Sequence, residues 1–292
     1  MRKFFSIAKA TALEIISEPL TLLIMLASLV MSVLAPAFHY HQFGEATRMA
    51  RDAGVSSLFL GGTALAVFGT IRAFRREIES GTLDMALAHP ISRGAFFLAK
   101  TAGCFAAYLA FATVLGAVAV TMTTGAAIGG AVAEKSGDIA RIWGPSLALG
   151  VAVMLLPLVF GAALNRFARC RFTVSAGLVA ALTALAGVAY RFQPALALKL
   201  APVLTLSAVP SVVLLAAAAA FAVRFKINAA ASAAGGTLLA MMPFIGNYYL
   251  PDALAKGGSL PWSYVLLAAA TAIPAIAALL ALGAVWMGRV ER

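Results

Sequence analysis

Apolar residues are gathered along this chain into runs, each close to the ~20 residues that a helix needs to cross the ~30 Å core of a lipid bilayer. Eight such runs cover residues 20–38, 55–71, 95–124, 142–164, 172–190, 200–223, 227–245 and 262–287. The fifth and seventh runs are short and rich in Ala and Gly, so either could be re-entrant instead of crossing. The pattern predicts an all-α polytopic membrane helix bundle, one transmembrane domain over residues 1–292, with eight transmembrane helices and six as the alternative.

The first 19 residues differ from the runs that follow. Between Arg2 and Ser17, polar or small residues recur every three or four positions, opposite a face of Phe, Ala and Ile. This periodicity is typical of an amphipathic helix that lies in the membrane interface. Pro19 stands where proline favours the first turn of a new helix. We therefore expect an interfacial N-terminal helix over residues 1–19, not a removable signal peptide, followed by a turn into the first crossing.

Charge supports the membrane assignment and predicts an orientation. Only 11% of residues are charged, against about 25% in soluble domains, and 62% are hydrophobic. The 22 basic residues form short clusters between the apolar runs, which is typical of helix ends and not of a nucleic-acid surface. With eight crossings and the N-terminus inside, fifteen of them face the cytoplasm and seven the other side. We expect both termini in the cytoplasm and the chain in a bacterial inner membrane.

Residues that could carry chemistry are few. His39 and His41 are two positions apart and do not share a helix face, so we expect no metal site. Residues 94–101, GAFFLAKT, resemble the phosphate-binding pattern GxxxxGK[ST] but have Ala99 in place of its last glycine, and no strand precedes them. Cys104 and Cys170 match no metal or redox spacing. We expect no cofactor bound by this chain.

Catalysis and ion-coupled transport are also disfavoured. The sequence contains no HExxH, no GxSxG and no paired-carboxylate site, so we expect a non-enzymatic chain. Ion-coupled transporters place ionisable residues inside the membrane. Asn165, Asn228 and Lys100 lie near the ends of the runs, where we expect them to reach water.

The most informative stretch is 72–100, RAFRREIESGTLDMALAHPISRGAFFLAK, because it concentrates charge in a charge-poor chain. Its pattern predicts a helix to about residue 80, a break at Gly81, a short helix around residues 83–88, and Ser92 as the N-cap of the third run. A solvated loop is the simplest interpretation of such a segment. The order of its residues points to something more specific.

This stretch resembles the loop between the second and third spans of type-2 ABC exporter permeases. The family pattern is an acidic residue, Gly-Thr-Leu, Pro-(Ile/Val)-Ser-Arg, an aromatic residue and Lys. The matching residues are Glu77, Glu79, Gly81, Thr82, Leu83, Pro90, Ile91, Ser92, Arg93, Phe96 or Phe97, and Lys100. The N-terminal helix and residues 243–267 resemble the family too, whereas residues 126–223 hold two more apolar runs than its usual six-span plan.

The resemblance implies a function and a set of partners. Residues 72–93 would be a cytoplasmic coupling loop that docks on a separate ATP-binding subunit, which would carry the ATP. A second permease chain, identical or related, would complete the complex in membrane lipid, without nucleic acid. The implied docking residues are Arg75, Arg76, Glu77, Glu79, Gly81, Thr82, Leu83, Met85, Leu87, Pro90, Ser92 and Arg93.

Within that set, Leu83, Met85 and Leu87 would make apolar contacts and the charged residues would form a polar rim. Gly81 would allow the sharp change of direction. We expect the permease subunit of an ATP-driven ABC exporter. The alternatives are an ion-coupled secondary transporter and a non-transporting membrane anchor of a cell-envelope assembly.

Overall fold

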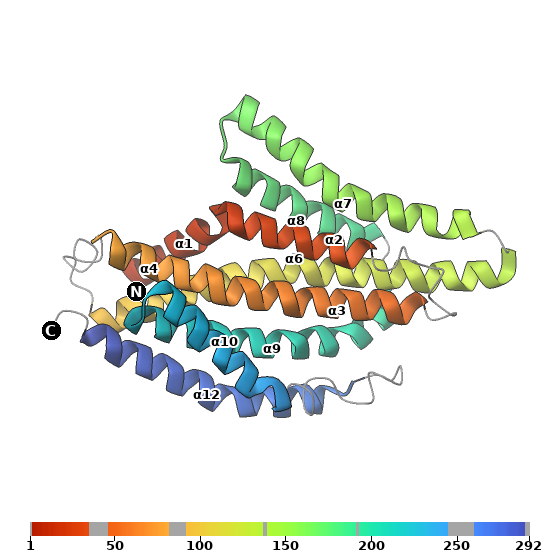
Figure 1. Cartoon of the computed structure of the whole chain (residues 1–292). Coiled ribbons are helices and arrows are strands. Elements are labelled where there is room, and N and C mark those ends of the chain that lie inside the picture. Colours follow the sequence, from red (N-terminus) through yellow and green to blue (C-terminus); the bar gives the residue numbers. More distant parts are fainter. Residues whose placement is uncertain are drawn as a thin grey trace.

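The computed structural model describes residues 2–34, 46–81, 92–136, 139–190, 193–244 and 260–289, and these residues form helices joined by short turns, without strands (Figure 1). The elements are α1 (Arg2–Ser17), α2 (Pro19–Leu34), α3 (Ala46–Ala64), the π-helix η3 (Leu65–Gly69), α4 (Thr70–Glu79), α6 (Arg93–Ser136), α7 (Ile139–Ala168), α8 (Phe172–Tyr190), α9 (Pro194–Arg224), α10 (Ile227–Phe244) and α12 (Trp262–Gly288). The predicted all-α helix bundle is confirmed.

The number of helices able to cross a membrane is smaller than the predicted eight. Within the described residues, six helices are long and apolar enough: Thr47–Glu79, Arg93–Ile128, Gly150–Ala168, Phe172–Tyr190, Pro194–Arg224 and Trp262–Gly288. The α1–α2 pair adds a seventh if it is taken as one span bent by 62°. The fifth apolar run is therefore long enough, whereas the seventh is a shorter apolar helix, Ile227–Met241. Six is the alternative number that the sequence predicted beside eight.

The N-terminal segment bends where the sequence predicted a new helix. Helix α1 ends at Ser17, α2 begins at Pro19, and the two meet at 62°. Ile15 and Thr11 of α1 are buried, while Phe5 is 67% exposed. Helix α1 lies so close to α6 that a Cβ on Gly103 would collide with the backbone oxygen of Ala8. One side of α1 is thus fixed on the bundle, and the location of its other side in the membrane interface remains a prediction.

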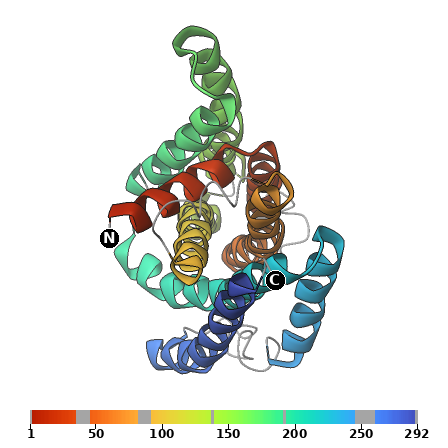
Figure 2. The same ribbon diagram turned by 90° about the vertical axis from the view of Figure 1, so that its left-hand side faces the viewer.

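The centre of the bundle is formed by α3, α6 and α9, with α7 and α8 on one side and α10 and α12 on the other (Figures 1 and 2). Small residues let α9 approach its neighbours, since five consecutive alanines, Ala216 to Ala220, are all buried. Two polar contacts join the central helices. The Tyr108 hydroxyl donates to the Ala208 carbonyl oxygen at 3.2 Å, and the hydroxyls of Thr63 and Ser211 lie 3.3 Å apart.

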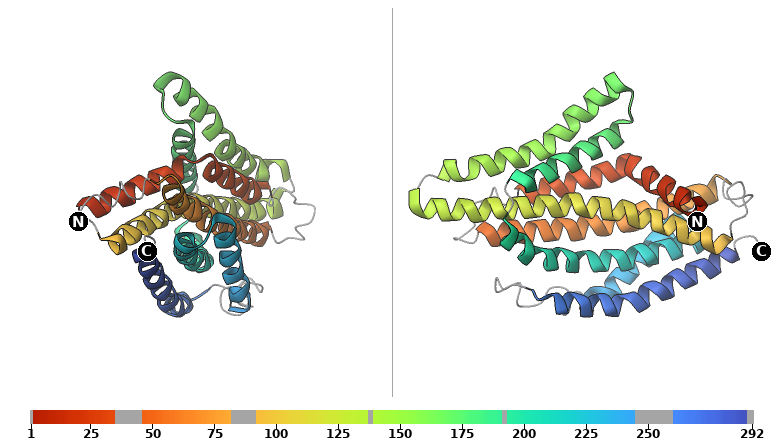
Figure 3. Two further views of the ribbon diagram at one scale, coloured as in Figure 1. Left: turned by 60° about the vertical axis from the view of Figure 1, so that its left-hand side comes forward. Right: turned by 180° about the vertical axis from the view of Figure 1, so that it is seen from behind.

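Helices α6 and α7 reach beyond the rest of the bundle at the end away from the termini (Figures 1 and 3). Helix α6 has 44 residues, which at 1.5 Å per residue is about 66 Å, roughly twice the hydrocarbon thickness. Both chain ends, the end of α4, and the α7–α8 and α9–α10 junctions gather at the opposite end. The basic clusters around Arg171 and Arg224, at the start of α8 and the end of α9, therefore lie at the same end of the bundle. Which side of the membrane this end faces remains a prediction.

Candidate functional site

The second span continues without a break into the segment that the sequence singled out. Helix α3, the π-helix η3 and α4 form one rod, because the residues before and after η3 keep helical backbone angles. A π turn holds one extra residue and shifts the register of everything after it. The sequence LAVFG gave no signal for this turn. Its consequence is that α4 presents Ile71 and Phe74 to the bundle.

Helix α4 has a buried face and a charged face. Ile71 and Phe74 are each 1% exposed, and the Phe74 ring packs on Phe97 of α6 with ring centroids 5.5 Å apart. The opposite face carries Arg76 and Glu79, whose side chains are 67% and 56% exposed. The end of the rod is therefore anchored to α6 while its charges remain available to another molecule.

A buried ion pair strengthens this anchor. The Lys100 ammonium of α6 lies 2.6 Å from the Glu77 carboxylate of α4, and their side chains are 1% and 28% exposed. The same ammonium lies 5.6 Å from the Phe74 ring and 5.9 Å from the Phe96 ring, within range of cation–π attraction. The expectation that Lys100 reaches water was wrong. Helix α4 covers it, and Glu77 neutralises its charge.

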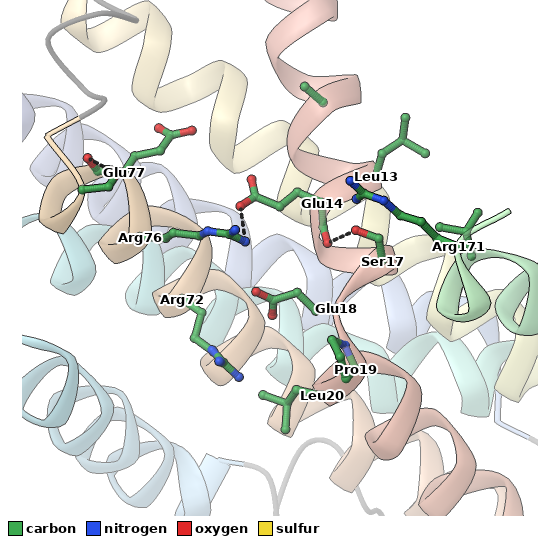
Figure 4. A pocket seen from close by; sticks show the side chains of 13 residues that line it. Leu13, Glu14, Ser17, Glu18, Pro19, Leu20, Arg72, Arg76, Glu77 and Arg171 are labelled. Atoms are coloured by element: carbon green, nitrogen blue, oxygen red, sulfur yellow. Dashed lines mark hydrogen bonds and ion pairs between the residues drawn. The ribbon is translucent and has the colours of Figure 1, made fainter. Parts of the chain in front are cut away.

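Two further ion pairs use the predicted docking residues. Arg75 binds Glu79 one turn further along α4, at 2.8 Å. Arg76 reaches Glu14 of α1 at 3.3 Å (Figure 4). The charges at the end of α4 thus divide into an internal link through Glu77, a bridge to α1 through Arg76, and the exposed Arg75–Glu79 pair.

The end of α4 and the start of α6 have the local features that the sequence predicted. Helix α4 ends at Glu79, and Gly81 has a φ of +69°, a left-handed conformation that favours glycine just beyond a helix end. Helix α6 begins at Arg93, and the Ser92 hydroxyl accepts a hydrogen bond from the Ala95 N–H at 3.3 Å. The helix break at Gly81 and the Ser92 cap are confirmed.

Several predicted positions lie outside the described residues. These are the short helix at 83–88 and the docking residues Thr82, Leu83, Met85, Leu87 and Pro90. His39 and His41 are also outside the described residues. Residues 94–101, which resemble a phosphate-binding loop, form the first turns of α6.

Comparison with known proteins now adds to this geometry. The family model described as ABC-2 family transporter protein matches residues 17–182, more than half of the chain and the whole of the coupling segment. The chain belongs to the ABC-2 transporter family. No curated protein and no solved structure matches it. The match runs from α2 into α8, so it includes part of the stretch that departed from the six-span plan and ends before residues 243–267.

Membership in the ABC-2 family has direct consequences. The chain is an integral membrane protein and the permease component of an ABC transporter. A permease of this family works with a cytoplasmic ATP-binding subunit.

Proposed function

We propose that this permease exports its substrate with energy from a separate ATPase subunit, and that the ATPase docks on residues 72–93. One observation carries the proposal. The exposed end of α4 is continuous with a membrane-crossing rod and is linked to two other helices through Glu77–Lys100 and Arg76–Glu14. A force applied to this end is therefore delivered to α6 and α1 together.

The charges that face outward suit docking. Glu79 is 56% exposed, and its pair with Arg75 is worth only a few tenths of a kcal/mol as an exposed i,i+4 pair. A partner can replace that pair without disrupting α4. Glu77, in contrast, belongs to the interior of the bundle. We therefore assign it to force transmission and no longer to the rim of the docking surface.

Co-purification tests the docking surface. Tagged wild-type chain is expected to bring down an ATP-binding subunit with a complete phosphate-binding loop, identified by mass spectrometry. Glu79→Lys should reduce the recovered subunit at least tenfold, because it reverses an exposed charge at the docking surface. Lys226→Glu, an exposed charge reversal at the same end of the bundle, is the matched control and should leave recovery unchanged.

The alternatives predict other outcomes. An ion-coupled transporter would move substrate in vesicles that lack the ATPase and would stop when the ion gradient is dissipated. A membrane anchor would lose assembly with Glu79→Lys without any substrate flux to lose. Export by the proposed mechanism requires ATP on the ATPase side and stops with Glu79→Lys.

A further inference from the structure

A cavity of about 1130 Å³ lies beside the coupling segment, at the bend between α1 and α2 (Figure 4). Its walls come from α1, the bend, α4 and the first turn of α8. Six charged side chains line it: Glu14, Glu18, Arg72, Arg76, Glu77 and Arg171. If α1 lies in the membrane interface as predicted, this charged cavity lies at the depth of lipid headgroups.

Three of these six charged side chains form ion pairs within the chain. Glu14 is paired with Arg76, and Glu77 with Lys100. Glu18, Arg72 and Arg171 are left, and no side-chain ion pair joins any of them to another described residue. The Oε2 atom of Glu18 is buried and has no hydrogen-bond partner among the described residues. A buried carboxylate oxygen is normally satisfied by a hydrogen-bond donor, and a ligand in this cavity could supply one.

The three remaining groups differ in position as well as in charge. Glu18 stands at the bend and points toward α4, while Arg171 reaches toward α1 from the start of α8 (Figure 4). Arg72 belongs to the α4 wall. Arg171 and Arg72 lie on opposite sides of the Glu18 carboxylate in Figure 4. A guanidinium group and a carboxylate that line one cavity complement a ligand that carries a phosphate and a cationic hydrogen-bond donor.

An apolar pocket of about 290 Å³ adjoins the charged cavity, and Val174 lines both. Its walls are Met25 of α2, Phe111 of α6, Leu178 of α8 and their apolar neighbours. The two cavities together offer charged groups at headgroup depth and apolar walls along the crossing helices. That combination fits an amphipathic ligand better than a soluble one, and better than the charged surface of a partner protein.

We propose that the charged cavity binds the headgroup of an ethanolamine phospholipid from the leaflet on the side of the chain termini. The phosphate lies at Arg171, the primary ammonium donates to Glu18, and one acyl chain enters the apolar pocket. Ethanolamine is distinguished from choline by its N–H donors, which Glu18 requires. The bound lipid would bridge α1, α4 and α8, three elements beside the coupling segment.

Native mass spectrometry of the full-length chain, purified in detergent and stripped of lipid, tests the proposal. Dioleoyl phosphatidylethanolamine, phosphatidylcholine and phosphatidylglycerol are added separately. Wild type should bind the ethanolamine lipid about tenfold more tightly than the choline lipid. Glu18→Gln should abolish this preference, and Arg171→Gln should weaken all three lipids about tenfold. Arg166→Gln, an exposed change at the end of α7 that does not line the cavity, is the control.

A second experiment distinguishes binding of the whole lipid from binding of its free headgroup. Glycerophosphoethanolamine, which has the headgroup without acyl chains, should compete at least a hundredfold more weakly, and Ala181→Phe, which fills the apolar pocket, should weaken lipid binding. In a Cys170→Ser background, which removes the exposed thiol, low and equal labelling of the buried Cys104 thiol confirms that each variant is folded.

Three outcomes would overturn the assignment: equal binding of ethanolamine and choline lipids by wild type, a preference that survives Glu18→Gln, or tighter binding of phosphatidylglycerol that ignores Glu18. Because no ATPase is present, failure here leaves the proposed docking on residues 72–93 untouched. Conversely, if the co-purification experiment contradicts the proposed docking, the lipid-binding result is unaffected.

Discussion

Removing either charge of the Glu77–Lys100 pair should destabilise the junction between α4 and α6, and the two removals should differ in size. The Lys100 side chain is 1% exposed, whereas Glu77 is 28% exposed at the edge of the charged cavity. Glu77→Gln leaves a buried ammonium without a counter-charge. Lys100→Met leaves an unpaired carboxylate on a side chain that is only partly buried. The first variant should therefore be the more damaging.

The magnitude follows from this difference in burial. Breaking a buried pair by removing one partner costs about 3–5 kcal/mol, and we take about 3 kcal/mol for Glu77→Gln because the pair is partly open on the Glu77 side. A polar group left unsatisfied but partly hydrated costs about 1–2 kcal/mol, which we assign to Lys100→Met. The double variant removes both charges and should be less destabilised than Glu77→Gln alone.

Cys104 provides the assay. It lies one helical turn beyond Lys100 on α6 and is 2% exposed, so a maleimide reaches it only when the α4–α6 junction opens. In a Cys170→Ser background, which removes the exposed thiol, a loss of about 3 kcal/mol should speed labelling by about a hundredfold or more. Lys100→Met should speed it about tenfold. Equal labelling rates for the two single variants, or effects that simply add in the double variant, would refute the proposal that the Glu77–Lys100 pair holds α4 against α6.

Three further changes test the packing around this junction. Gly81→Ala forces a side chain into a left-handed turn at +69° and should cost about 1–2 kcal/mol, seen as a lower melting temperature in detergent. Gly103→Ala places a Cβ against the α1 backbone and should lower the melting temperature, whereas Gly116→Ala, where the nearest atom is 3.9 Å away, should not. Tyr108→Phe removes the hydrogen bond to α9 and should cost about 1 kcal/mol; no change in melting temperature would contradict this.

The sequence predicted those features of the fold that depend on neighbouring residues. Run lengths and apolar composition identify membrane helices because backbone groups in lipid must be satisfied within a helix. Pro19, Gly81 and Ser92 act through their own backbone or a residue three positions away, so the helix start, break and cap were predicted correctly. Helix lengths were less predictable, and the seventh run folds as a helix too short to count as a span.

The burial of Lys100 could not be predicted in the same way. It depends on α4, whose Glu77 is 23 positions earlier in the chain, and on the packing of Phe74 and Phe96 around the ammonium. A lysine eight residues into a helix is otherwise expected to extend its side chain to the membrane surface. The π-helix η3 sets the direction of α4, and its sequence LAVFG carries no sign of a π turn. The pair is therefore a product of tertiary structure.

A buried lysine also bears on the choice between an ATP-driven permease and an ion-coupled transporter, since intramembrane charges mark ion pathways. The position of Lys100 argues against such a pathway. It lies about 10 Å from the start of α6, and its partner Glu77 belongs to α4 and lines the charged cavity. Among the described residues, the other buried polar groups are hydroxyls of Ser, Thr and Tyr108 and the Cys104 thiol. Several of these, including Thr101 and Thr123, donate to carbonyls of their own helix. An ion would find no second charged group to receive it further along the described interior. The pair is placed to hold α4 against α6, which is the role that a transmitted force requires.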